Sequence, residues 1–228
     1  MPGKIRLSHE RIIDAAARVA DRGGIASVSM RSVGSELGVE AMSLYHYVAS
    51  KEAMLDELSE WVFAKIAIPH SGVPWRQALW ERAHSAREVL SAHTWGLGMM
   101  ESRPAPGPSQ LRHYDAMMGR LSSAGFSAAL ATTAFATVDA FVFGFVLTES
   151  TLPLEAGSGA EQQLAEAANL DATEFPHLTA MLSELFASGT YSFGEEFQAG
   201  LTILLEGIEQ RLAGEGAESS QPGQSPIT

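Results

Sequence analysis

Apolar side chains recur at spacings of three and four residues along most of the chain, which places them on one face of an α-helix. Near the N-terminus two such sets follow one another: Met30, Val33 and Leu37, then Leu44 and Val48. Ser29 precedes the first set as a suitable N-cap, and Gly38 follows it, where a glycine ends a helix at low cost. The pattern predicts two short helices joined by a turn.

A further helix precedes this pair and another follows it. The first has an apolar stripe at Ile12, Ile13, Ala16, Val19 and Ala20. Ser8 is placed to cap its start, and Gly23 and Gly24 end it. Ser50 is placed to cap the later helix, which is predicted over residues 51–66. Together these signals predict a three-helix head followed by a connecting helix.

The remainder of the chain also follows a helical period. Helices are predicted over residues 75–93, 109–124, 127–152, 175–187 and 193–212. They are separated by a break at 69–74, a short glycine-spaced segment at 95–100, a proline-rich segment at 103–108, and an acidic stretch at 154–173 that is either a loop or a weak helix. No strand pattern competes, so the predicted fold class is all-α.

Four parts of the chain follow from this division. They are a helix-turn-helix head at 1–50, a connecting helix at 51–67, a larger helical domain at 68–213, and a tail at 214–228 whose low-complexity composition predicts disorder. A chain of 228 residues is long enough for one ordinary domain and a small one.

The charge is distributed unevenly. The whole chain carries a net charge of -12, whereas residues 1–51 hold seven basic and five acidic residues and are therefore slightly positive. DNA would be able to approach only this N-terminal part, because the rest repels phosphate. Charge alone also fits an acidic protein whose N-terminus is basic by chance.

Composition excludes several classes of protein. Without a cysteine, the chain has no disulfide framework, no thiolate metal site and no cysteine nucleophile. The first ten residues lack the apolar core of a signal peptide, so the expected location is the cytoplasm. The sequence has neither an HExxH metal motif nor a GxSxG nucleophile elbow, and we therefore expect no enzymatic activity.

The second short helix of the head leaves an unusual face uncovered. Its small or hydrogen-bonding residues point away from Leu44 and Val48: Ala41, Met42, Ser43, His46 and Tyr47. Such a surface suits base edges in the major groove, while Ser29, Arg31 and Lys51 would reach phosphates. The alternative is a helical hairpin in which Tyr45 and Tyr47 only pack.

Residues 8–66 resemble the tetracycline-repressor (TetR) family of transcription regulators. The most specific part is L-G-V-x-x-x-S-L-Y-x-Y-V-x-x-K-E, from Leu37 to Glu52. The resemblance implies recognition-helix positions at Ser43, Tyr45, His46 and Tyr47, and phosphate-facing positions at Ser29, Arg31 and Lys51. Segments 75–152 and 175–212 resemble the ligand-binding domain of the tetracycline repressors themselves.

This second resemblance implies a repressor that a small molecule releases from DNA. It places the effector pocket at Arg82, Ala86, Met99, Met100, Ser102, Met117, Phe135 and Thr148. The positions that hold magnesium in the family correspond to Met99 or Met100 and to Thr148, which suit that cation poorly, although Glu149 is a carboxylate next to the last of them. We therefore expect no metal, no cofactor and a largely apolar effector.

Individual members of this set have other interpretations. The methionines are equally consistent with core packing, and Arg82 either pairs an acidic group of the effector or joins two helices.

Helices 127–152 and 193–212 have more apolar surface than one domain covers, which predicts a homodimer on a palindromic operator; the alternative is that both are core helices. The competing functions are a DNA-binding regulator without an effector and a helical enzyme.

Overall fold

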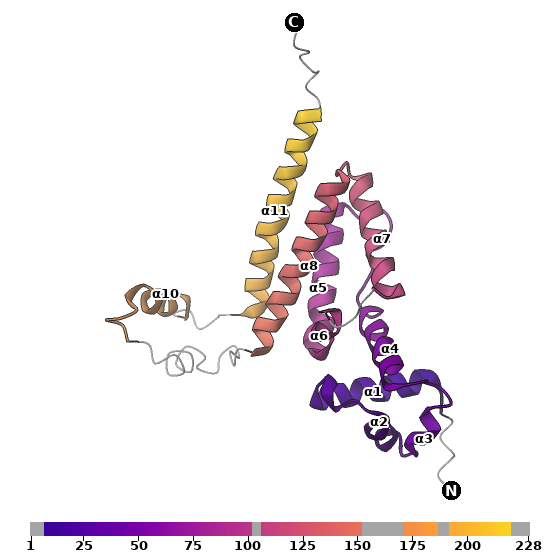
Figure 1. The fold of residues 1–228 in the computed structure, drawn as a ribbon. Coiled ribbons are helices and arrows are strands. Elements are labelled where there is room, and N and C mark those ends of the chain that lie inside the picture. The colour runs from indigo at the N-terminus through magenta and orange to yellow at the C-terminus, as the bar shows by residue number, and fades with distance from the viewer. Residues whose placement is uncertain (1–6, 102–105, 152–170, 187–191, 220–228) are drawn as a thin grey trace, which may run out of the picture. The chain divides into compact units, whose positions relative to one another are not determined.

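The computed structural model describes residues 7–101, 106–151, 171–186 and 192–219. Every regular element in these ranges is helical, which confirms the predicted all-α class (Figure 1). The elements are α1 (His9–Gly23), η1 (Ile25–Ser27), α2 (Met30–Leu37), α3 (Ala41–Leu44), α4 (Lys51–Phe63), α5 (Trp75–Ala92), α6 (Trp95–Glu101), α7 (Pro108–Ser123), α8 (Ala128–Thr151), α10 (Pro176–Phe186) and α11 (Phe193–Ser219).

The predicted serine caps are confirmed. Ser8 Oγ accepts a hydrogen bond from the backbone N–H of Arg11, and Ser50 Oγ accepts one from Ala53, 3.1 Å away. Ser29 forms a reciprocal capping box with Ser32, in which each side chain bonds the backbone N–H of the other. Each cap satisfies a donor that the first helical turn leaves free, so three helix starts were fixed by local sequence.

Two glycines allow the tight turn between α2 and α3. Gly38 has φ of 68° in the left-handed region, where a side chain is strained. Gly34 lies where the chain returns on itself: a Cβ there would be 2.9 Å from the carbonyl oxygen of Val39. The helix expected to reach Val48 ends at Leu44, and the next three residues form a turn in which Val48 N–H donates to Leu44 O at 2.9 Å.

Helix α4 connects the head to the following helices. It packs on α1 on one side and on α6 and α7 on the other (Figure 1). Its buried face consists of Met54, Leu58, Ser59, Val62 and Phe63. Any displacement of α4 relative to α6 and α7 therefore moves the head.

The glycine-spaced segment at 95–101 forms α6. Gly96 is buried, and a Cβ there would lie 3.3 Å from side-chain atoms of Leu90 and Val62, so glycine allows α6 to approach α5 and α4 closely. Helices α5, α7 and α8 contribute the largest buried side chains of this region: Leu79, Leu90, Met117, Leu121 and Phe135.

The chain divides into two compact units, residues 1–143 and 144–228. In the second unit, the ring of Phe145 on α8 packs edge-on against Phe197 of α11 at 5.2 Å between centroids. Helix α8 is long and apolar enough to cross a membrane by length and composition, as core helices of globular domains also are. Within the first unit its residues Phe135, Val138 and Val142 are fully or almost fully buried.

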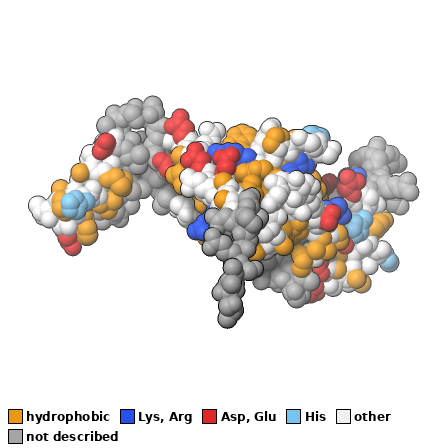
Figure 2. Space-filling view, turned by 90° about the horizontal axis from the view of Figure 1, so that it is seen from above, with side chains coloured by type: hydrophobic (Ala, Val, Ile, Leu, Met, Phe, Trp, Pro, Cys, Tyr) orange, Lys and Arg blue, Asp and Glu red, His pale blue; other side chains and the backbone are white. Residues whose placement is uncertain are grey.

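Helix α11 continues to Ser219, so the prediction of a disordered tail beginning at residue 214 is wrong for its first six residues. Alanine and glutamate at 213, 215 and 217 favour helix and outweigh the two intervening glycines. Leu178 and Met181 of helix α10 are exposed, as is Phe175 just before the helix. Figure 2 shows hydrophobic side chains on the surface of the molecule. Most of the predicted loop or weak helix at 154–173 lies outside the described residues.

Candidate nucleic-acid interface and interior cavity

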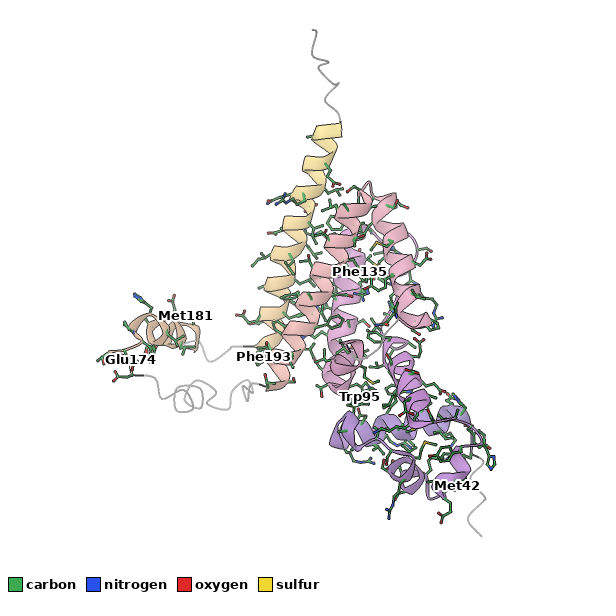
Figure 3. The ribbon with its side chains drawn as sticks, in the orientation of Figure 1. Met42, Trp95, Phe135, Glu174, Met181 and Phe193 are labelled. Atoms are coloured by element: carbon green, nitrogen blue, oxygen red, sulfur yellow. The ribbon has the colours of Figure 1, made fainter. Side chains whose placement is uncertain are left out.

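The predicted DNA-facing residues of α3 and its turn lie together on the surface of the head. Met42 is 73% exposed, on the outer side of the three-helix head (Figure 3), and Tyr45 and Tyr47 are 48% and 43% exposed. His46 is also exposed, whereas Ala41 and Ser43 are half-buried. Leu44 and Val48 are buried beneath them, so their packing holds the exposed side chains in place.

The predicted phosphate-facing residues lie at the starts of two helices. Arg31 is exposed in the first turn of α2, and Lys51 is the first residue of α4. Ser29 caps α2, and its hydroxyl is engaged with Ser32 at 2.9 Å. Helix N-termini offer free backbone N–H groups and a partial positive charge, which favour a phosphate.

Two other cations among the described residues of the head are already paired. Arg18 Nε donates to Glu36 at 2.9 Å, and Arg22 donates to the other oxygen of the same carboxylate. The hydrogen bond from Arg18 lowers the pKa of the Glu36 carboxyl most, and the bond from Arg22 lowers it further. Within the described part of the chain, the side chains of Arg31 and Lys51 have no such carboxylate partner, which leaves them available to an external anion.

A small cavity lies inside the first unit, beside the end of α4. Its lining residues come from α4, α5, α7 and α8: Phe63, Arg82, Gln110, His113, Tyr114, Phe135 and Asp139. The side chains leave about 20 Å³ of space, roughly what one water molecule requires. Tyr114 is 46% exposed, so the cavity lies directly beneath the surface. Figure 3 labels Phe135, on α8.

Two of the lining residues, Arg82 and Asp139, form a buried ion pair. Both terminal nitrogens of Arg82, on α5, donate to the carboxylate of Asp139, on α8, one of them at 3.2 Å. The guanidinium carbon also lies 4.4 Å from the centre of the Phe135 ring, in a cation–π contact. Burial raises the pKa of Asp139, and the charge of Arg82 opposes this effect. The pair joins α5 to α8 through two residues that are 57 positions apart in sequence.

His113 connects the cavity to α4. Its Nε2 lies 3.3 Å from the backbone carbonyl oxygen of Phe63, the last residue of α4. The side chain is buried, and this burial, followed by the charge of Arg82, lowers the pKa of the imidazole. A change of hydrogen bonding at His113 therefore acts directly on the end of the helix that carries the head.

Two of the predicted ligand residues, Arg82 and Phe135, come together in the cavity. Ala86, Met99 and Met117 are buried but do not line it. Ser102 and the side chain of Met100 lie outside the described residues. Thr148 belongs to the second unit, where its hydroxyl donates to the carbonyl oxygen of Gly144 at 2.9 Å.

Sequence reasoning missed five lining residues: Phe63, Gln110, His113, Tyr114 and Asp139. One of them had a detectable signal. Asp139 is the single charged residue in the largely apolar run from 128 to 148, and a carboxylate on a buried helix requires a partner. Within the described residues, no group of three histidine, aspartate or glutamate side chains is placed to hold a metal ion.

A helix-turn-helix with an uncovered polar and aromatic face, joined by one helix to a larger helical domain, defines a DNA-binding transcription regulator. Residues 12–58 match the model of bacterial regulatory proteins of the tetR family, and residues 68–212 match the tetracyclin repressor-like C-terminal domain. The chain belongs to the TetR family and is a regulator rather than an enzyme.

Individual relatives agree with this assignment. An HTH-type transcriptional regulator of Saccharopolyspora erythraea is 32% identical over 173 residues, which cover 75% of this chain and 73% of the relative. The class A tetracycline repressor from transposon 1721 of Escherichia coli is 29% identical, covering 90% of this chain and 92% of the relative. The crystal structure of Streptomyces coelicolor ActR in complex with actinorhodin aligns with a TM-score of 0.70 at 25% identity, covering 90% and 96%.

Proposed function

We propose that the protein is a cytoplasmic repressor that binds a palindromic operator as a homodimer and is released when a small, largely apolar effector enters each protomer. The observation that carries the DNA-binding part is the exposed face of α3 and its turn. Met42, Tyr45, His46 and Tyr47 are exposed above a buried Leu44, where a purely structural hairpin would cover its aromatic residues.

Homodimer formation is supported by apolar side chains that the single chain leaves exposed in the second unit. Leu147 on α8 is 56% exposed and Ile203 on α11 is 69% exposed. A repressor of this kind needs two heads, because one short recognition helix reads few base pairs. The domain limits of 1–50, 51–67 and 68–213 are part of the same proposal.

An effector is supported by the cavity next to α4 and by the relatives, among them a tetracycline repressor and an ActR complex with actinorhodin. The small size of the cavity favours a second candidate, a regulator that binds DNA without an effector. The two functions differ in whether any small molecule weakens operator binding.

Selection from random-centred DNA duplexes at about physiological salt, followed by sequencing of the retained fraction, tests the DNA-binding part. We expect a palindrome, with its enrichment lost for Tyr47→Ala and kept for Leu111→Ala, an exposed apolar residue on α7. Binding without sequence preference would refute the proposal that the exposed face of α3 and its turn contacts base edges.

Light scattering tests the oligomeric state. Ile203→Lys is expected to give monomers, while Thr202→Lys, at an exposed neighbouring position of α11, leaves the dimer intact. A monomeric wild-type protein at the concentration of the binding assay would refute the homodimer.

A further inference from the structure

Two of the residues that line the cavity each have a buried polar atom without a hydrogen-bond partner among the described residues: Nδ1 of His113 and Nε of Arg82. Both side chains are at least nine-tenths buried, since His113 and Arg82 are each 4% exposed. Leaving such atoms unpaired destabilises the protein, so their presence at one cavity points to a group that binds them.

The chemistry of each atom can be assigned. The carbonyl oxygen of Phe63 can only accept, so Nε2 of His113, 3.3 Å away, carries the proton. Burial keeps the imidazole neutral by lowering its pKa, and Nδ1 is therefore an acceptor. Nε of Arg82 is a donor in every state of that residue. The complementary group must donate to one atom and accept from the other, which an O–H group does, whether it belongs to a water molecule in the present cavity or to a ligand that replaces it.

The remaining lining is aromatic. Phe63, Tyr114 and Phe135 contribute three rings, and those of Tyr114 and Phe135 lie 4.7 Å apart between centroids. Such walls favour a flat aromatic ligand over a sugar or an amino acid. Because the present space is about 20 Å³, the ligand must displace a side chain, and Tyr114 is the most exposed of the lining residues.

We propose that the effector is a hydroxylated aromatic compound whose phenolic hydroxyl donates to Nδ1 of His113 and accepts from Nε–H of Arg82. The ring system packs against Phe63, Tyr114 and Phe135. This inference rests on the proposed function for the presence of an effector, and it adds the chemical class that the cavity selects. A methyl ether of the same ring accepts from Arg82 but cannot donate to His113, so the cavity discriminates between them.

Binding of 2-naphthol and of 2-methoxynaphthalene to the full chain, measured by calorimetry without DNA, tests this class. We expect 2-naphthol to bind at least about tenfold more tightly, the effect of one buried hydrogen bond of roughly 1.4 kcal/mol. Equal affinities, tighter binding of the ether, or no binding of 2-naphthol overturns the proposal.

Two substitutions of His113 test the roles of its two ring nitrogens separately. The amide nitrogen of glutamine overlays Nε2, so His113→Gln keeps the donor to Phe63 and removes the Nδ1 acceptor. Asparagine reaches only to Nδ1, so His113→Asn keeps that acceptor and loses the contact with Phe63. We expect the preference for 2-naphthol to disappear in His113→Gln and to persist in His113→Asn and in the control His70→Gln, at an exposed site.

A spectroscopic measurement on the wild-type chain covers the case in which a variant fails to fold. The ¹⁵N signal of His113 Nδ1 is expected to shift when 2-naphthol binds and to stay unchanged with the ether; no shift with 2-naphthol refutes the contact. Because these experiments contain no DNA, they are independent of the operator selection. Failure of the selection with a confirmed phenol site would remove the repressor function and leave the ligand class intact.

Discussion

Removing the carboxylate of Asp139 is expected to destabilise the protein strongly. Asp139→Ala leaves the guanidinium of Arg82, which is 4% exposed, without its buried counter-ion. Breaking a buried ion pair from one side costs about 3–5 kcal/mol. For a chain of this length each kcal/mol lowers the midpoint of thermal unfolding by roughly 2–4 °C, so the expected decrease is about 6–20 °C.

Removing both charges is expected to cost less than removing one. Arg82→Met fills much of the space of the arginine stem and keeps an apolar contact with Phe135, so the combination Arg82→Met with Asp139→Ala leaves no unpaired charge. We expect the double variant to be more stable than Asp139→Ala alone by about 2 kcal/mol, because it leaves no uncompensated charge buried.

Denaturant unfolding followed by circular dichroism measures the stability of the wild type, Asp139→Ala, Arg82→Met and the double variant. All are compared at one protein concentration, because the stability of a dimer depends on concentration. Glu36→Ala serves as the control, since it breaks a pair exposed to solvent with Arg18 and Arg22 and is expected to change stability far less. A loss below about 1 kcal/mol for Asp139→Ala, or a double variant as unstable as the sum of the single changes, would refute the structural importance of the buried pair.

Three further outcomes are expected. Tyr47→Ala should weaken operator binding by about 1–3 kcal/mol, measured by fluorescence anisotropy, with an unchanged melting temperature; unchanged affinity would contradict a role in reading DNA. Arg31→Ala should weaken binding to all sequences alike and reduce the slope of log affinity against log salt by about 1 per protomer, and an unchanged slope would argue against a phosphate contact. Because burial lowers the native pKa of His113, the unfolded state binds more protons as the pH falls through about 6.5, so unfolding free energy should decrease there by at most about 1.4 kcal/mol per pH unit. His113→Gln should lack this component, and identical pH profiles of the two proteins would contradict it.

Local sequence signals were sufficient for most helices of the head. Ser8, Ser29 and Ser50 each satisfy a backbone donor within three residues, and Gly38 adopts the left-handed conformation at the end of α2. These features depend on neighbours in the chain, so they are visible without a fold. The exposed face of α3 was predictable for the same reason, because Leu44 and Val48 fix which side is buried.

The cavity was only partly predictable, because its contacts join distant parts of the chain. Arg82 and Phe135 were selected by resemblance to the family, but the partner of Arg82 lies 57 residues away and no local period relates the two. His113 is likewise paired with the end of α4, 50 residues earlier. The single charge of Asp139 in the largely apolar run from 128 to 148 indicates that a buried partner exists, without indicating which.

The contacts of α4 limit how an effector can act on the head. Other contacts of this helix include Trp61 Nε1 donating to Asp14 of α1 at 2.8 Å, Glu60 accepting from the backbone N–H of Ser109 at 2.8 Å, and the Trp61 ring packing on His93 with centroids 4.9 Å apart.

Coupling between two binding sites commonly amounts to about 1–3 kcal/mol, whereas one hydrogen bond contributes roughly 0.5–1.5 kcal/mol. The bond from His113 to Phe63 is therefore too weak to account for the upper part of that range alone. An effector that released DNA by a large factor would have to change the Glu60 or Trp61 contacts as well, and by linkage operator DNA would weaken its binding equally. The head and the cavity then form one two-state system in which α4 is the shared element.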